Sequence, residues 1–232
     1  MKYKLKIIDI IEETEGTKTY FFERPEDFQW EPGANIHVGL VGFDQGEKPN
    51  KEWVRHMSII TLPRENRIGI TTRVPGSSSE FKKKLEKLKI GDELIIFKLG
   101  ARMTLRRSGK PVLLISMGVG LSAMRSLILS YIDNREGIPN VININVDSSS
   151  FIYKNELDKI TDERYSNYWL SSRQAFYEIL KNASNIEDGV YYVVGSDTFI
   201  TEVVGLLKEN KIKRENIIID KKQEDIDRFW NF

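Results

Sequence analysis

The sequence predicts two domains: an antiparallel Greek-key β-barrel over residues 1–108, then a doubly wound, five-stranded parallel α/β sheet over residues 109–232. Six short β-like runs separated by turn residues fill the first half. In the second half, apolar runs alternate with segments at helical spacing, which is typical of a parallel sheet. The pattern changes at Ser108-Gly109-Lys110, and this change places the expected boundary.

The barrel strands are predicted from polar and apolar alternation, which is clearest in the first run. One helix interrupts them, where Ser77 and Glu80 stand at capping-box spacing. The lysines at 82–84 alternate with acidic and apolar residues, so a solvated helix face is expected there. The six runs are YKLKIIDI, TKTYFFE, ANIHVGLV, VRHMSIIT, RIGITTRV and ELIIFKL.

The second domain is predicted from longer apolar runs, as expected of strands covered on both faces. Its five strands are PVLLIS, NVININV, RYSNYWL, VYYVVG and ENIIID. The expected helices lie near residues 121–132, 154–160, 173–182 and 197–209.

Composition restricts the chemistry of the chain. With no cysteine, disulfides, Cys-ligated zinc and Cys-ligated iron–sulfur clusters are excluded. Two histidines, His37 and His56, are too few for a histidine metal site, so no metal is expected. A net charge of +1 gives no general attraction to nucleic acid. The N-terminus lacks a secretory apolar segment and no apolar run approaches the ~18 residues of a membrane span, so a cytoplasmic location is expected.

The first segment that suggests chemistry is Arg55-His56-Met57-Ser58 on the fourth barrel strand, followed by Gly76-Ser77-Ser78-Ser79 at the helix start. A guanidinium fork and a helix N-terminus are both suited to holding a phosphate. The alternatives are a surface arginine on a strand and a plain helix cap.

The second such segment is Gly118-Val119-Gly120-Leu121, where a strand turns into a helix. Glycines let the backbone approach an anionic group closely, and the following helix presents unpaired N–H groups to it. A tight strand–helix connection without a ligand would use the same residues.

Taken in order over nearly the whole chain, these segments resemble the ferredoxin–NADP reductase superfamily. In that family an Arg-x-Tyr-Ser strand and a Gly-x-x-Ser helix start bind flavin, and they are similar to residues 55–58 and 76–79 here. The family's Gly-x-Gly-x-x-Pro turn resembles residues 118–123, and its Cys-Gly-Pro motif resembles Val194-Gly195-Ser196. The resemblance implies a flavin-binding barrel followed by an NAD(P)-binding Rossmann-like domain.

The resemblance also implies roles for single residues. Arg55 and Ser77–Ser79 would hold the flavin phosphates, and Ser58 would act as the catalytic residue by bonding near flavin N5. Residues 118–121 would seat the nicotinamide pyrophosphate, and Gly195 would leave room for the nicotinamide. FAD is favoured over FMN.

Three residues and one segment depart from the family pattern. Met57 stands in place of the tyrosine that stacks on the flavin, and Val194 in place of the cysteine near the nicotinamide. Ala123 replaces the proline of the glycine turn, and Lys98-Leu99-Gly100 departs from a Gly-Pro-x-Gly segment. The Met57 departure implies that one face of the flavin is covered differently, and the Val194 departure puts fast hydride transfer in doubt.

The choice of nicotinamide has conflicting signals. Asp147 ends the second parallel strand, where a carboxylate favours the ribose hydroxyl of NAD. Ser172 and Arg173 follow the third strand, with Tyr177 downstream, as in family members that contact the 2′-phosphate of NADP. NADP is therefore favoured and NAD is kept open, with Ser172 as a plain helix cap for the alternative.

The C-terminus is aromatic, with Phe229, Trp230 and Phe232, and is expected to dock. In reductases that this chain resembles, a terminal aromatic covers the flavin, and Trp230 is the residue chosen for that role. Docking on the protein's own core or in a dimer interface is the alternative.

The expected function is a flavin-dependent NAD(P)H oxidoreductase that takes a hydride from NAD(P)H onto FAD and passes electrons to a separate acceptor. The acceptor would be a redox protein, a diffusible flavin, a ferric chelate or oxygen. A non-catalytic nucleotide-binding or electron-transfer subunit on the same scaffold is the alternative. A methyltransferase is disfavoured, because the barrel precedes the glycine turn.

Overall fold

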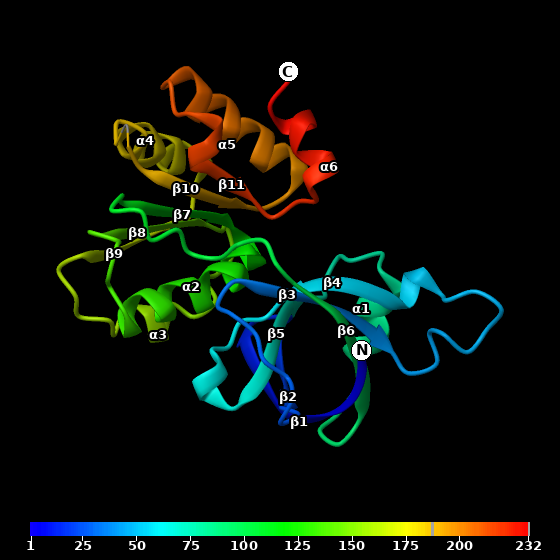
Figure 1. The fold of residues 1–232 in the computed structure, drawn as a ribbon. Coiled ribbons are helices and arrows are strands. Elements are labelled where there is room, and N and C mark those ends of the chain that lie inside the picture. Colours follow the sequence, from blue (N-terminus) through cyan, green and yellow to red (C-terminus); the bar gives the residue numbers. More distant parts are fainter. Residues whose placement is uncertain (187, 232) are drawn as a thin grey trace. The chain divides into compact units, whose positions relative to one another are not determined.

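The computed structural model describes residues 1–186 and 188–231, and Figure 1 shows its fold. The chain divides into two units, Met1–Thr104 and Leu105–Phe232. This division falls just ahead of Ser108, where the sequence pattern changes. Each unit has a hydrophobic core of its own.

The first unit contains one antiparallel six-stranded sheet in the order β4-β3-β6-β1-β2-β5. The predicted antiparallel barrel is confirmed as an open half-barrel whose edges are β4 and β5. The N–H of Ile60, just after β4, donates to the carbonyl of Gly69 on β5 over 3.0 Å. The strands are β1 (Lys2–Thr14), β2 (Thr17–Glu23), β3 (Ala34–Leu40), β4 (Val54–Ser58), β5 (Arg67–Arg73) and β6 (Glu93–Ala101).

The core of this unit follows from the alternation of its strands. On β1, Leu5 and Ile7 point inward and are buried, while the neighbouring Lys4 and Lys6 are exposed. Helix α1 (Glu80–Leu85) adds Phe81 and Leu85 to the same core. Two 3₁₀ turns, η1 (Lys51–Trp53) and η2 (Pro63–Glu65), connect the strands around β4.

The start of α1 differs from the predicted one. The hydroxyl of Ser79 accepts a hydrogen bond from the N–H of Lys82, which makes Ser79 the N-cap. The predicted cap at Ser77 is wrong, because the Ser77 hydroxyl instead accepts from the N–H of Ser79 over 3.2 Å. The helix therefore begins later than the capping-box spacing indicates.

The second unit contains five parallel strands in the order β11-β10-β7-β8-β9, which confirms the predicted parallel sheet. Figure 1 shows α4 and α5 on one side of this sheet and α2 and α3 on the other. The strands are β7 (Val112–Met117), β8 (Val141–Val146), β9 (Tyr165–Leu170), β10 (Val190–Val194) and β11 (Ile217–Ile219). The helices are α2 (Leu121–Asp133), α3 (Lys154–Leu157), α4 (Arg173–Ala183) and α5 (Asp197–Glu209), with 3₁₀ turns η3 (Gly118–Gly120) and η4 (Arg214–Asn216).

Because all five strands are parallel, their carboxyl ends meet at one edge of the sheet. The glycine turn, Asp147, Ser172 and Gly195 each follow a different strand at this edge. The topology therefore gathers the predicted nucleotide-contacting residues of this unit, although they are far apart in the sequence.

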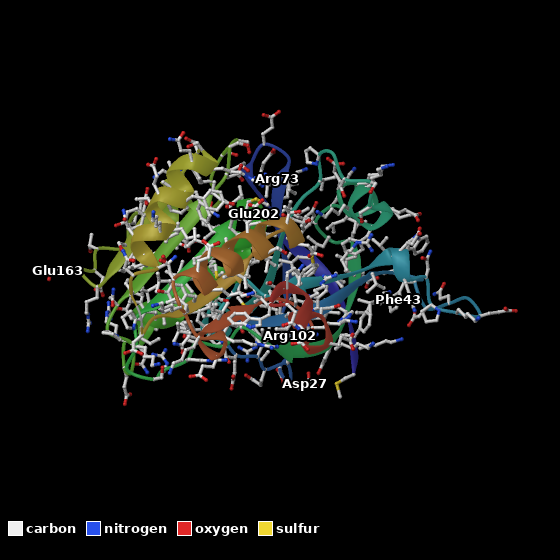
Figure 2. The ribbon with its side chains drawn as sticks, turned by 90° about the horizontal axis from the view of Figure 1, so that it is seen from above. Asp27, Phe43, Arg73, Arg102, Glu163 and Glu202 are labelled. Carbon is white, nitrogen blue, oxygen red and sulfur yellow. The ribbon has the colours of Figure 1, made fainter. Side chains whose placement is uncertain are left out.

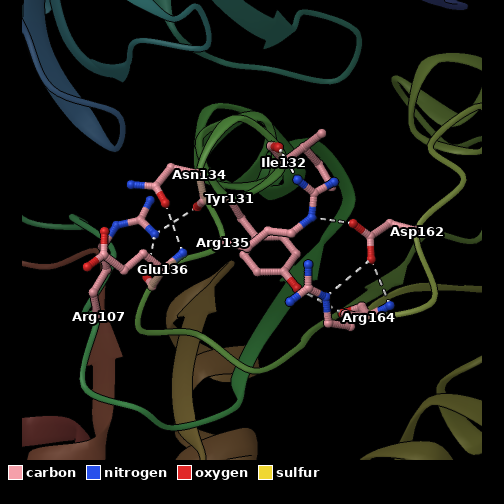
Figure 3. Close-up of polar contacts among 8 residues, drawn as sticks. All are labelled: Arg107, Tyr131, Ile132, Asn134, Arg135, Glu136, Asp162 and Arg164. Carbon is pink, nitrogen blue, oxygen red and sulfur yellow. Dashed lines mark hydrogen bonds and ion pairs between the residues drawn. The ribbon is translucent and has the colours of Figure 1, made fainter.

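At the C-terminal end of α2, arginines donate hydrogen bonds to backbone carbonyls at the end of the helix and just beyond it (Figure 3). The Arg107 guanidinium donates to the carbonyls of Asn134 and Glu136 over 2.8 and 2.9 Å. Arg135 pairs with Asp162, and the pKa of Asp162 is lowered by the N–H of Arg164 and by Arg135. These contacts fix the end of α2 opposite the glycine turn.

The C-terminal residues form two short elements that the sequence did not predict, α6 (Gln223–Ile226) and η5 (Asp227–Phe229). Phe229 is buried in the core of the second unit. The Lys208 ammonium on α5 donates to the carbonyl of Trp230 over 2.6 Å, and Arg214 pairs with Asp227. The tail therefore docks on its own unit. Phe232 lies outside the described residues.

Candidate functional site

Arg55 lies on the edge strand β4, directly opposite Val38 of β3. Paired residues of neighbouring strands share a face, so Arg55 lies on the face that buries Val38. Its guanidinium donates to the carbonyls of Val54 and Glu52 over 2.7 and 3.2 Å. Among the described residues it has no carboxylate partner.

Lys82 provides a second cation close to Arg55. Its half-buried ammonium donates to the carbonyl of Arg73 over 2.8 Å. Burial lowers the pKa of Lys82 first, and the positive charges of Arg55 and Arg73 lower it further. Within residues 1–186 and 188–231, Lys82 forms no ion pair. Two neighbouring cations without an acidic partner fit an anion such as a phosphate.

The expectation of a solvated face for the three lysines is therefore wrong for Lys82. Lys83 is exposed, and Lys84 lies over the Trp53 ring and pairs with Glu80. The lysines differ because consecutive residues of a helix point in different directions, and only position 82 lies next to the end of β5.

The remaining residues of the β4 motif divide between two faces of the strand. Met57 packs against the barrel core and lies opposite Ile36. His56 is exposed on the other face, where its Nε2 lies 2.7 Å from Oδ1 of Asn35. Ser58 is directly opposite Asn35, and its hydroxyl makes no hydrogen bond within the described part of the chain.

Asn35 is a site residue that the sequence analysis did not select. Its side chain is buried, and its Nδ2 has no hydrogen-bond partner among the described residues. A Cβ on Gly100 would lie 3.0 Å from Asn35 Oδ1, so the backbone of β6 passes close by. A buried amide donor without a partner beside the Ser58 hydroxyl fits a polar ligand at this edge of the half-barrel.

The glycine-serine segment before α1 is open on one side. Gly76 has a φ of +73°, and a Cβ built there would have no atom within 4 Å. The hydroxyls of Ser77 and Ser79 accept backbone N–H groups, whereas Ser78 is exposed. This segment has room for a ligand group close to Lys82.

The glycine turn of the second unit is held close to β10. Gly118 has a φ of +56°, and a Cβ on Gly120 would lie 2.8 Å from the carbonyl oxygen of Val194. Val119 is half-buried and Leu121 is buried. Among the described residues no side chain caps the start of α2, and the N–H of Leu121 bonds to the carbonyls of Gly118 and Val119, so an anion can approach this helix start without displacing a side chain.

Asn145 holds this turn, and the sequence analysis did not select it. Its Nδ2 donates to the Ser116 hydroxyl over 2.8 Å and reaches the carbonyl of Gly118 at 3.4 Å. The side chain is buried, and its Oδ1 has no partner among the described residues. An asparagine inside the apolar run NVININV was the available signal.

Two residues at the same sheet edge are occupied by local contacts. Asp147, favoured for NAD, accepts from the N–H and hydroxyl of Ser149 over 2.9 and 2.7 Å. The Ser172 hydroxyl accepts from the N–H of Ala175, so Ser172 caps α4. These bonds match the plain capping alternative for Ser172.

Arg173 begins α4 and faces α5. Its Nη1 lies 3.4 Å from both carboxylate oxygens of Glu202. Tyr177, one turn further on α4, donates its hydroxyl to the same carboxylate. Glu202, labelled on α5 in Figure 2, is a third residue that the sequence analysis did not select.

Gly195 and Trp230 lie at different places in the second unit. A Cβ on Gly195 would lie 2.4 Å from the ring of Phe199, so only glycine fits at the end of β10. Trp230 packs beside Lys208 and Arg214, whose charges lie over its ring. These contacts favour docking on the unit's own core, and the flavin-covering role of Trp230 stays a prediction.

The described residues provide neither a metal-binding cluster nor a membrane-spanning helix. They contain no cluster of three or more acidic or histidine side chains that could hold a metal ion. None of their helices is both long enough and apolar enough to cross a membrane.

Comparisons with known proteins identify the fold. No family model and no curated protein matches the sequence. Among solved structures, a ferredoxin NADP+ reductase from Neisseria gonorrhoeae with bound FAD and NADP superposes with a TM-score of 0.76 at 15% identity, covering 94% of this chain and 98% of that one. This chain has the ferredoxin reductase-like fold.

Two further solved structures share the ferredoxin reductase-like fold. Ferredoxin-NADP+ reductase from Plasmodium falciparum with 2′P-AMP matches with a TM-score of 0.76 at 14% identity, covering 95% of each chain. The CS-b5R domains of human Ncb5or, in the NAD+ form, match with a TM-score of 0.77 at 16% identity, covering 95% of this chain and 70% of that one.

Proposed function

We propose that this chain is a flavin-dependent NAD(P)H oxidoreductase that binds FAD in its first unit and NADP or NAD in its second. The observation that carries the proposal is the pair of cations at Arg55 and Lys82, which has no acidic partner among the described residues. The ferredoxin reductase-like fold supports it, because solved structures of that fold carry FAD and NADP.

The flavin phosphates would be held by Arg55, Lys82 and the serines before α1. A guanidinium and an ammonium donate charge-assisted hydrogen bonds to phosphate oxygens, and such bonds are stronger than neutral ones. The backbone turn at Gly76 leaves space beside them. Ser58 and Asn35 would orient the polar edge of the flavin ring with donors that have no partner within the described residues.

The nicotinamide dinucleotide would bind at the carboxyl edge of the parallel sheet. The uncapped start of α2 would hold its pyrophosphate, while Asn145 fixes the turn and Gly120 lets it lie close to Val194. Gly195 would leave room for the nicotinamide ring. Arg173 is the candidate contact for a 2′-phosphate.

When bound, FAD supplies hydride acceptance and the release of single electrons, so the protein contributes placement and electrostatics. We propose that the electrons pass to a separate acceptor, either a redox protein or a small molecule such as a flavin or a ferric chelate. With no cysteine in the chain, a Cys-ligated iron–sulfur acceptor would belong to another protein.

An absorbance spectrum of the purified protein, followed by anaerobic titration with NADPH and with NADH, tests the proposal. We expect a yellow protein whose flavin absorbance bleaches with at least one nicotinamide. A colourless protein that takes up neither FAD nor FMN would contradict it. Flavin that binds but is reduced by neither nicotinamide would favour the non-catalytic alternative.

Replacing Arg55 with alanine tests the flavin phosphate site directly. Loss of a charge-assisted hydrogen bond costs about 1.5–3 kcal/mol, which predicts roughly ten- to hundredfold weaker FAD binding. Arg55→Lys keeps the charge but loses the planar fork, so its FAD affinity should lie between those of Arg55→Ala and the native chain. Unchanged FAD content in Arg55→Ala would remove Arg55 from the site.

A further inference from the structure

The start of α4 holds a charge pair that bears on the choice of nicotinamide. The Arg173 guanidinium lies 3.4 Å from both carboxylate oxygens of Glu202, which stands on α5. Their side chains are 56% and 36% exposed, so solvent and ligands can reach the pair. The Tyr177 hydroxyl also donates to Glu202. The Glu202 carboxylate is therefore held by both Arg173 and Tyr177 of α4.

The pair lies in an open groove of about 530 Å³ between α4 and α5. Arg173 and Tyr177 contribute to one wall, and Glu202, Gly205 and Glu209 contribute to the other. Two carboxylates against one guanidinium leave the groove with a net negative charge. A dianionic phosphate entering this groove therefore meets repulsion from Glu202 and Glu209 as well as attraction to Arg173.

We infer that Glu202 is a specificity-determining residue that lowers the affinity of this chain for the 2′-phosphate of NADP by competing for Arg173. The inference rests on the proposed function. A ribose 2′-hydroxyl carries no charge, so the carboxylate affects its binding little. The native chain then accepts NADH and NADPH with similar affinity, although Arg173 by itself favours NADPH.

The size of the effect follows from the exposure of the pair. An exposed ion pair is weak, so a phosphate can displace Glu202, but it loses part of the affinity that a free guanidinium would give. Removing the carboxylate charge should therefore tighten binding of a 2′-phosphorylated nucleotide about three- to tenfold.

Calorimetric titration of the full-length chain with 2′P-AMP and with 5′-AMP tests the inference without any flavin chemistry. Glu202→Gln should tighten 2′P-AMP about three- to tenfold and change 5′-AMP less than about twofold. Adding Arg173→Met to Glu202→Gln should abolish the gain, because the guanidinium is its source. The ratio of KM values for NADPH and NADH should shift in the same direction.

Glu209→Gln is the matched control. It removes the same charge from the same helix and groove, but Glu209 forms no ion pair with Arg173 among the described residues. A smaller gain in Glu209→Gln than in Glu202→Gln supports competition for Arg173. Equal gains in the two variants would indicate only a general charge effect and would overturn the inference.

The outcome separates this inference from the proposed function. If NADPH or NADH reduces the flavin but Glu202→Gln leaves the affinity for 2′P-AMP unchanged, the proposed function stands and the role of Glu202 is refuted. If Glu202→Gln tightens both nucleotides equally, the role is also refuted. A chain reduced by neither nicotinamide would refute the reductase proposal, and the role of Glu202 in nicotinamide choice with it.

Discussion

Lys82 shows how the surroundings of one residue change what its charge can do. It sits on a helix whose other lysines are solvated or paired, yet its ammonium is half-buried beside Arg55 and the carbonyl of Arg73. Burial and like charges both disfavour the charged form. Because its surroundings disfavour the charged ammonium, Lys82 contributes little to folding stability. Its charge is better suited to binding an anion.

Lys82→Met should therefore separate binding from stability. Without ligand, its free energy of unfolding should stay unchanged or rise, because a desolvated charge and its repulsion are removed. FAD binding should weaken about tenfold or more, because one charge-assisted contact is lost. Denaturant unfolding and flavin titration measure the two effects.

Lys83→Met is the matched control, since Lys83 is exposed and next in sequence. It should change neither quantity measurably. A Lys82→Met protein that binds FAD as the native chain does would show that Lys82 takes no part in the site.

At the scale of elements, α1 shows a boundary that depends on contacts rather than on spacing. Four candidate capping positions follow one another in Gly76-Ser77-Ser78-Ser79. The capping-box spacing selects Ser77, but Ser79 is the residue whose hydroxyl accepts the N–H of Lys82. Burial of Phe81 and Leu85 in the half-barrel core selects this start, because it points both side chains inward.

Ser79→Ala should lower the free energy of unfolding by about 1 kcal/mol, the usual cost of a lost N-cap. Ser77→Ala should have a clearly smaller effect, because its hydroxyl bonds only to the turn before the helix. Urea unfolding of the two variants measures the difference. A larger loss in Ser77→Ala would restore the capping box that the sequence suggested.

Across the whole molecule, buried tyrosines make the folding stability of both units depend on pH in the alkaline range. Burial raises the pKa of Tyr20 in the first unit, and of Tyr191 and Tyr192 in the second, from 10.0 to about 12. Burial and the hydrogen bond to Glu202 raise the pKa of Tyr177 to about 12 as well. The folded chain therefore keeps these phenols neutral at a pH where the unfolded chain ionises them.

The sign of the pH effect follows from these raised values. The contribution of the buried phenols to the free energy of unfolding is fully present below about pH 10 and is lost as the pH rises towards about 12. The loss is up to roughly 1–2 kcal/mol for each fully buried phenol. The urea midpoint should fall steeply over that range. Tyr191→Phe should reduce the slope, whereas an unchanged midpoint between about pH 10 and pH 12 would contradict the burial of these groups.

Residue periodicity predicted the two-unit order and the antiparallel and parallel sheets, while residue types and the family resemblance singled out the segments around Arg55, Gly76 and Gly118. These features depend on nearest neighbours in the chain, because strand alternation and glycine turns are local properties. The family resemblance put every residue of the β4 motif into one site. Strand alternation places Met57 and Ser58 on opposite faces, but it could not show which of the two faces packs against the core.

Only the tertiary structure brought together Lys82 with Arg55, Asn145 with the glycine turn, and Glu202 with Arg173. Each pair joins different elements, so its members are brought together by packing and not by spacing in the sequence. Residue type predicted which groups carry charge. Which charges neutralise one another depends on the fold, because electrostatic interactions depend on distance and burial in space.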